Sequence, residues 1–292
     1  MYKKISIILT LLLLCLFCYL VFVFIKKPTF PLVGILFPPA PTPTPTPYDY
    51  PTKYSQTYSR LYQNFLDLNE REKTELLVSA KNNFQITCSS SWNSNICTEG
   101  LTIIENNILI QFEYVSRFLK ELWPLPLNKI TINLLPYDNW NSAYANSITI
   151  DFYITDLSGF SGMSYYQTIV HELIHSYQDT AKHFSIFDAQ CLCEGMAEYY
   201  SGKNYNPGWL EYRKEQLSTL AQVREWFSVA DPIERGAAYN SCLRFYIYLA
   251  QDLNRESDIF YLFFDNSDSF SNLFNTKFGL QEDLYRQAIG LK

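Results

Sequence analysis

The stretch His171-Glu172-Leu173-Ile174-His175 decides how the chain is interpreted, because two of the chain's only three histidines stand four residues apart in it. The surrounding residues have the apolar spacing of a helix, on which residues four apart point to the same side. Two imidazoles on one side supply half of a tetrahedral zinc site, and the glutamate between them can reach a metal-bound water. The alternative is a chance pair of histidines on a helix surface, but residues downstream favour the metal site.

A third ligand is expected because a catalytic zinc ion takes three protein ligands and leaves one position open for water. Glu194, separated from His175 by eighteen residues, lies in a second helical pattern that runs from about Asp188 to Tyr200. Glu198 stands one turn further along the same face, where it can accept the free N–H of a ligating histidine. Two alternatives remain open: Glu198 is the ligand in place of Glu194, or both glutamates form a solvated helix face.

The His-Glu-x-x-His motif followed by Glu-Gly-x-Ala-Glu-Tyr resembles the gluzincin metallopeptidases, which include thermolysin, the zinc aminopeptidases and peptidase MA-like proteins. The resemblance covers about residues 147–254, and its histidine-to-glutamate spacing is that of the zinc aminopeptidases. It implies that the zinc ligands are His171, His175 and Glu194. It also implies that Glu172 is the general base of a peptidase.

The resemblance extends to positions around the motif. Glu198 stands where thermolysin has an aspartate, and the resemblance gives it the role of supporting a ligating histidine. Tyr239 matches a tyrosine in a similar helix of peptidase MA-like proteins, which implies that its hydroxyl donates to the reaction's oxyanion. Residues 158–164 lack the acidic residue with which the aminopeptidases hold a substrate's free amine, and this argues against aminopeptidase specificity.

The remaining secondary structure is predicted from periodicity. Alternating β-branched residues predict strands at Lys129–Leu135 and Ser147–Ile154. Helical patterns cover Ser55–Phe84, Glu99–Trp123, Pro207–Phe227, Gly236–Asn254 and Gln281–Leu291. The fold class is therefore α+β, mostly helical, with a small mixed sheet before the zinc helix. By resemblance this is a zincin-like metallopeptidase domain, in which the strand Thr149–Ile154 would edge the cleft and pair with an extended substrate.

The N-terminal part of the chain predicts a membrane anchor. Residues 5–25 carry no charge and are long enough to span a ~30 Å hydrocarbon layer, and no small-residue cleavage site follows. Proline and threonine alternate from Pro39 to Pro47, which predicts an extended spacer typical of the outer face of a membrane. We expect an anchor at 1–27, a stalk at 28–53 and a metallopeptidase-like domain at 54–292, outside the cytoplasm.

The cysteines outside the apolar segment are compatible with that compartment. Cys88 and Cys97 flank a Ser/Asn-rich stretch and are expected to form a local disulfide. Either Cys191 or Cys193 is expected to pair with Cys242, which leaves one thiol over. A zinc site built on the Cys-x-Cys pair is disfavoured, because a second pair of cysteines is missing.

The charge of the chain excludes one class of partner. The net charge is −6, and four lysines flank the apolar segment, so the rest of the chain is more acidic than the whole. Such a surface repels phosphate backbones, and nucleic acid is not an expected partner. The expected partners are a membrane and a peptide or protein substrate.

Taken together, the residues predict a membrane-anchored, Zn²⁺-dependent peptidase that hydrolyses peptide bonds with a zinc-activated water. Two alternatives remain: a catalytically inert zincin-fold domain that binds partners at a surface, and a zinc amide hydrolase acting on a non-protein substrate. Metal analysis followed by cleavage profiling on mixed peptides separates these readings.

Overall fold

The structure is a computed structural model that describes residues 55–88, 101–122, 128–136, 143–146, 148–154, 163–181, 186–203, 205–211, 213–229, 231–265 and 267–291. All of them belong to one compact unit, Pro47–Lys292. The predicted anchor (1–27) and stalk (28–53) lie outside the described residues. Within the described ranges, no helix combines the length and the apolarity that crossing a bilayer requires.

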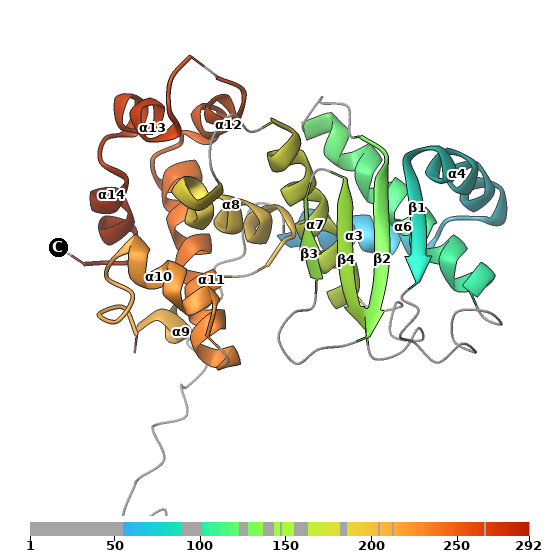
Figure 1. Cartoon of the computed structure of the whole chain (residues 1–292), viewed down its shortest axis with the longest axis horizontal. Helices are drawn as coiled ribbons and strands as arrows, with labels where there is room; N and C mark the ends of the chain where they lie inside the picture. The colour runs from blue at the N-terminus through green and yellow to red at the C-terminus, as the bar shows by residue number, and fades with distance from the viewer. Residues whose placement is uncertain are drawn as a thin grey trace, which may run out of the picture. The chain divides into compact units, whose positions relative to one another are not determined.

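The described residues form helices and a sheet (Figure 1). The helices of the first part of the chain are α3 (Ser55–Leu66), α4 (Glu70–Asn83), α6 (Leu101–Leu122), α7 (Met163–Ala181) and α8 (Ile186–Tyr200). They are followed by α9 (Pro207–Glu211), α10 (Leu220–Phe227), α11 (Pro232–Ile247), the π-helix η2 (Tyr248–Asp252), α12 (Glu256–Phe264), α13 (Phe270–Phe278) and α14 (Gln281–Ala288). The strands are β1 (Phe84–Cys88), β2 (Ile130–Pro136), β3 (Ala143–Ala145) and β4 (Thr149–Ile154).

The sheet has the strand order β1-β2-β4-β3 and precedes α7 in the chain. β1, β2 and β4 run parallel, and β3 pairs antiparallel with β4. The predicted small mixed sheet before the histidine helix is therefore confirmed. One prediction is wrong: β4 is an interior strand, because β3 pairs with its residues Ile150 to Phe152 on the side away from β2. Within the described part of the chain, β3 is the edge strand on that side.

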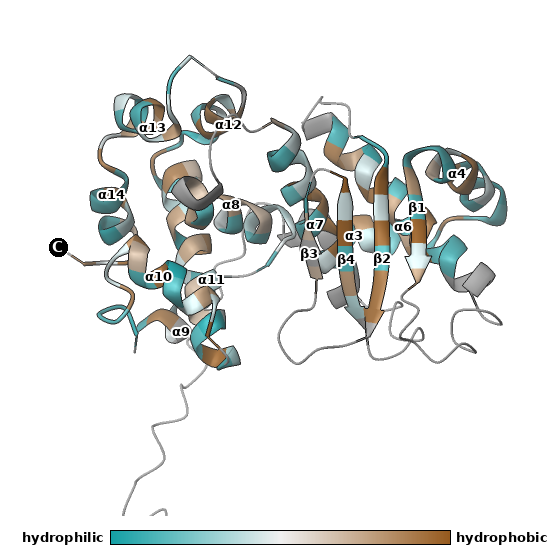
Figure 2. Ribbon diagram, in the orientation of Figure 1, coloured by the Kyte–Doolittle hydropathy of each residue, from teal (hydrophilic) through white to brown (hydrophobic). Residues whose placement is uncertain are grey.

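One face of the sheet is apolar because β2 and β4 alternate in side-chain type. Ile130, Ile132 and Leu134 of β2 are fully buried, as are Ile150 and Phe152 of β4. The intervening residues form a polar row on the other face, where Asn133 donates to Asp151 at 2.6 Å. Figure 2 shows hydrophobic residues (brown) along β2 and β4, and mostly hydrophilic residues (teal) on α4 and α14.

Helix α6 covers the apolar face of the sheet and connects it to the centre of the core. Phe112 of α6 is fully buried between Phe84 of β1 and Phe152 of β4, with ring centroids 5.6 and 5.8 Å apart. Aromatic rings of this size supply much of the buried area of a core. Helix α7 packs against α6, β3 and α8, so it joins the sheet to the helices that follow it (Figure 1).

Two of the predicted helices are wrong in extent, because each predicted range contains two separate helices. Residues 55–84 contain α3 and α4, and Asn69 begins α4 by accepting hydrogen bonds from the backbone of Arg71 and Glu72. Residues 207–227 contain α9 and α10, and Thr219 begins α10 in the same way. In both places the capping side chain satisfies backbone donors at the start of a new helix. The apolar periodicity runs on through this break, so periodicity alone does not reveal it.

The other elements match their predictions within a few residues, with four omissions. α6, α14, β2 and β4 lie where periodicity placed them, and the predicted helix 236–254 is α11 continued by η2. The short strands β1 and β3 and the helices α12 and α13 were not predicted. The class is nevertheless α+β and mostly helical, as the sequence indicates.

Candidate metal centre

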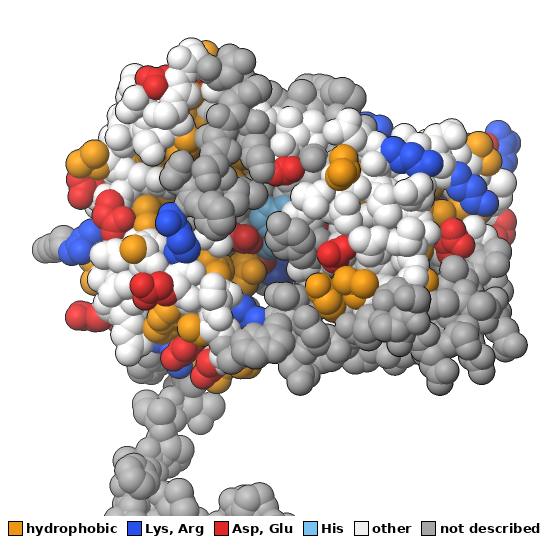
Figure 3. Space-filling model, viewed as in Figure 1, with side chains coloured by type: hydrophobic (Ala, Val, Ile, Leu, Met, Phe, Trp, Pro, Cys, Tyr) orange, Lys and Arg blue, Asp and Glu red, His pale blue; other side chains and the backbone are white. Residues whose placement is uncertain are grey.

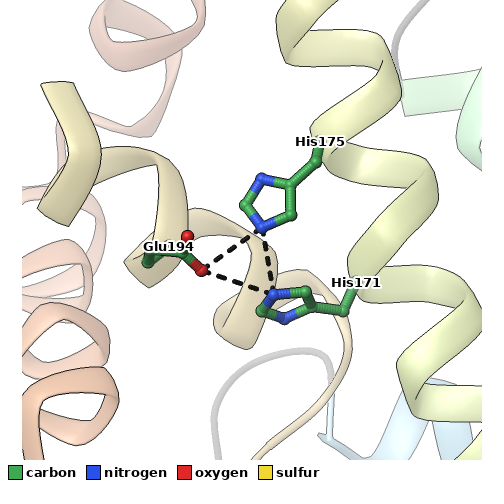
Figure 4. A group of neighbouring side chains, drawn as sticks. All are labelled: His171, His175 and Glu194. Carbon is green, nitrogen blue, oxygen red and sulfur yellow. Dashed lines mark hydrogen bonds and ion pairs between the residues drawn. The ribbon is translucent and has the colours of Figure 1, made fainter. Parts of the chain in front are cut away.

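The two histidines of the motif project from α7 toward α8 (Figure 4). Helix α7 packs inside the core, as the burial of its residues Ile169, Val170, Leu173 and Ile174 shows. Its histidine side chains are 10% and 12% exposed, so they are held by packing but remain within reach of solvent. Figure 3 shows histidine surface (pale blue) at the bottom of a recess, with acidic side chains (red) beside it.

Glu194 of α8 completes a three-residue cluster with these histidines. The Nε2 atoms of His171 and His175 are 3.0 Å apart. Oε2 of Glu194 lies 3.4 Å from Nε2 of His171 and 3.2 Å from Nε2 of His175. This group could hold a metal ion. A tetrahedral centre with bonds of about 2.0–2.1 Å holds its ligand atoms ~3.3 Å apart, so the observed triangle has the required size.

The hydrogen bonds around the cluster support that fit. Nδ1 of each histidine faces an acceptor on the outer side, so a neutral ring carries its proton there and a lone pair on Nε2. Two imidazole lone pairs and a carboxylate oxygen then point at one another without a proton to join them. Oε2 of Glu194 is buried and has no hydrogen-bond partner. A cation at the centre would relieve this repulsion. Imidazole nitrogens and carboxylate oxygens are ordinary zinc ligands.

The electrostatics of the cluster favour a positive charge at its centre. Burial by itself lowers the pKa of His171, but the neighbouring carboxylates of Glu194 and Glu198 raise it to about 10. Burial raises the pKa of Glu194, yet the neighbouring His175 and His171 hold it well below its usual range. The cluster therefore favours positive charge, and a metal cation could take the place of the proton.

Glu198 does not reach the centre; it lies behind His171. Its Oε1 is 3.1 Å from Nδ1 of His171, which is the separation of an ion pair rather than a well-aligned hydrogen bond. Lys203 donates to the same oxygen at 2.8 Å. Burial raises the pKa of Glu198, but Lys203 and His171 lower it below its usual value. The carboxylate is thus held charged beside the histidine, where it favours the Nδ1–H tautomer.

His175 has a different partner, which the sequence analysis missed. Its Nδ1 lies 2.8 Å from Oε1 of Gln178, and Gln178 donates from Nε2 to the carbonyl of Cys193 at 3.0 Å. The signal was present in the sequence, because a residue three positions after a helical histidine lies on the same face. Lys203 was also missed, and it lies five residues after Glu198.

Glu172 and Tyr239 lie beside the cluster. Glu172 is buried, and burial raises its pKa while the charges of His171 and His175 oppose that rise. The ring of Tyr239, on α11, is 6.3 Å from that of His171 and packs edge-on against Phe227. The charge of Glu194, followed by burial, raises the pKa of Tyr239 well above its usual value. Its hydroxyl therefore keeps its proton and can donate.

A disulfide and a glycine hold α8 against α11. Cys191 of α8 is bonded to Cys242 of α11, as one of the two expected pairings had it, and Cys193 is buried. A Cβ on Gly195 would lie 2.1 Å from the carbonyl oxygen of Cys242, so the two backbones touch there. Both contacts lie within a turn of Glu194 and Tyr239. Cys88 is also disulfide-bonded, and Cys97, its expected partner, lies outside the described residues.

Comparison with known proteins adds nothing to these observations. No protein-family model matches the chain. No curated protein and no solved structure shows significant similarity to it. Any functional conclusion therefore depends on the residues of the cluster and their surroundings.

Proposed function

We propose that this chain is a membrane-anchored, zinc-dependent peptidase of the gluzincin type. The observation that carries the proposal is the convergence of His171, His175 and Glu194, with ligand-atom separations of 3.0 to 3.4 Å. Two imidazoles and one glutamate are a ligand set of catalytic zinc, which leaves a further position for water. The nitrogen-rich set is less suited to magnesium or calcium, because those ions prefer oxygen ligands.

A zinc ion held by these three residues would make a water molecule acidic and polarise the carbonyl of an amide. Glu172 then acts as general base: its carboxylate accepts a proton from the attacking water as the oxygen bonds to the carbonyl carbon. The same residue returns the proton to the nitrogen when the carbon–nitrogen bond breaks. Its raised pKa, caused by burial, suits a group that must both accept and release a proton.

Tyr239 has the position and the protonation state for stabilising charge in this reaction. Negative charge develops on the carbonyl oxygen in the transition state, and a protonated phenol near the histidines can donate to that oxygen. Glu198 and Gln178 hold the two imidazoles from behind and are not expected to touch a substrate. The substrate is proposed to be a peptide or protein, and β3 is the described edge strand nearest α7 that an extended backbone could pair with.

The proposed location is the outer side of a membrane, with residues 5–25 as the anchor and the Pro/Thr stretch as a spacer. The Cys191–Cys242 disulfide supports this location, because disulfides persist mainly in oxidising compartments. The acidic net charge continues to disfavour nucleic acid as a partner.

The experiment that tests the proposal is metal analysis of the purified chain, followed by cleavage profiling on a mixed peptide library. We expect one zinc ion per chain and cleavage that a chelator stops. Glu172→Gln should retain zinc and lose activity by ~10²–10⁴-fold, which is the range of general acid–base catalysis. The matched control is Glu75→Gln, the same change at a largely exposed glutamate on α4. A chain without zinc, or a Glu172→Gln variant as active as the control, would refute the proposal.

A further inference from the structure

Gln178 connects the two helices that supply the metal ligands. It lies on α7 three residues after His175, and the residue is only 1% exposed. Its amide oxygen is 2.8 Å from Nδ1 of His175, and its amide nitrogen donates to the carbonyl of Cys193 on α8 at 3.0 Å. Cys193 directly precedes Glu194 in the chain. One side chain thus touches a ligand on α7 and the backbone next to a ligand on α8.

The contact to Cys193 fixes the orientation of the amide. A backbone carbonyl can only accept, so the NH₂ end of Gln178 must face Cys193 and the oxygen must face His175. An amide oxygen can only accept as well, so Nδ1 of a neutral His175 must carry the proton. Nε2 of His175 is then left with its lone pair directed at Glu194 and His171. The ligating tautomer is set without a charged group.

The two histidines are therefore supported in different ways. His171 faces Glu198, whose negative charge is matched by Lys203. A carboxylate at position 178 would instead bring a buried negative charge and would place an oxygen against the Cys193 carbonyl. Burying an unmatched charge or facing two acceptors is costly. An amide of this length satisfies both neighbours, while a carboxylate satisfies one.

We propose that Gln178 is a positioning residue: it sets the tautomer of His175 and holds the His175 ring in place relative to Glu194. The inference depends on the metal binding in the proposed function. It predicts that loss of the amide lowers the affinity for zinc, because a residue that hydrogen-bonds to a ligating histidine contributes about 10–100-fold to metal affinity. A glutamine that merely fills the core would affect the stability of the fold and not the metal.

The test compares the Gln178→Met variant with the wild type. Both are full-length chains purified in detergent micelles, because residues 5–25 are apolar. Methionine keeps the length of the side chain and removes both hydrogen bonds. The matched control is Gln111→Met, the same change at a buried glutamine on α6, a helix that supplies none of the ligands. Zinc affinity is measured by chelator competition, and the visible spectrum of the Co²⁺-substituted chain reports the ligand geometry.

We expect Gln178→Met to lose about 10–100-fold in zinc affinity and to alter the Co²⁺ spectrum. Gln111→Met should match the wild-type chain in both measurements, whatever it does to the unfolding temperature. The inference is overturned if the two variants keep wild-type affinity, or if both lose it equally, since either result gives Gln178 no special role. A wild-type chain that binds no zinc overturns the proposed function as well, whereas failure of the Gln178 comparison alone leaves that proposal standing.

Discussion

Gly195 of α8 lies so close to the backbone of Cys242 of α11 that no Cβ fits between the two residues. A Cβ at position 195 would be 2.1 Å from the Cys242 carbonyl oxygen and 2.7 Å from its carbon. These are backbone atoms, so the helices themselves would have to separate. Because Glu194 adjoins this contact on α8, the position of this proposed metal ligand depends on the absence of a side chain at the next residue.

The first prediction is that Gly195→Ala destabilises the chain and weakens zinc binding at the proposed metal site. Alanine in an ordinary helix gains about 0.5–1 kcal/mol over glycine, but overpacking costs about 1–3 kcal/mol and should outweigh that gain here. Urea unfolding of the metal-free chain measures the first effect, and zinc competition measures the second. An alanine variant that is more stable than wild type, with unchanged zinc affinity, would contradict the close packing.

The second prediction concerns the Cys191–Cys242 disulfide, which spans 51 residues. Closing a loop of that length removes entropy from the unfolded chain worth about 4 kcal/mol in the loop-closure account, and measured values are usually ~2–4 kcal/mol. The double variant Cys191→Ala/Cys242→Ala should therefore lose about that much free energy of unfolding. The control is Cys193→Ala, which removes a neighbouring buried cysteine and leaves the disulfide intact. Equal losses in the two variants would show that burial, and not the cross-link, matters.

The candidate site was largely readable from the sequence because helical geometry relates residues at short spacing. The four-residue step brings His171 and His175 to one side, and the same step separates Glu194 from Glu198. The structure places Glu194 at the centre and Glu198 behind His171, which the spacing alone left open. That choice depends on how α7 packs against α8, and no local pattern encodes a packing angle.

Other features were invisible for physical reasons. The strand β3 is only three residues long, which is too short to show an alternating pattern. Because β3 pairs with β4, the strand predicted to lie at the edge of the sheet is an interior strand. The caps Asn69 and Thr219 divide helices whose apolar spacing runs on across the break. The position of Gln178, three residues after His175, indicates a contact with that histidine, but its second contact, to the carbonyl of Cys193, depends on how α8 packs against α7.

The third prediction follows from the proposed peptidase function: Tyr239→Phe should slow peptide hydrolysis and leave zinc affinity unchanged. Phenylalanine keeps the ring against Phe227 and removes only the hydroxyl. Removing one donor to an oxyanion costs about 10²–10³-fold in kcat, and KM should change little because the bond forms in the transition state. Steady-state kinetics and zinc analysis measure the two effects. The same change at Tyr261, a half-exposed residue on α12, is the control. A Tyr239→Phe variant with wild-type kcat would exclude the residue from the reaction.

The last prediction concerns pH and follows from the competition between protons and metal at His171. In the metal-free chain the pKa of His171 is raised from 6.5 to about 10, because the neighbouring carboxylates of Glu194 and Glu198 outweigh burial. A raised pKa in the folded state adds stability that is complete below about pH 6.5 and is lost as the pH rises through about 10. The metal-free chain should therefore become less stable across that window.

The zinc-loaded chain should not share this decline, because its imidazoles have already given up their protons to bind the metal. The stabilisation that zinc provides should thus grow as the pH rises. Urea unfolding with chelator and with zinc, at several pH values between 6.5 and 10, measures the difference. His171→Gln should flatten the metal-free slope. A metal-free wild-type chain whose stability stays level or increases over this range would contradict the raised pKa, and with it the view that the cluster is built around a positive charge.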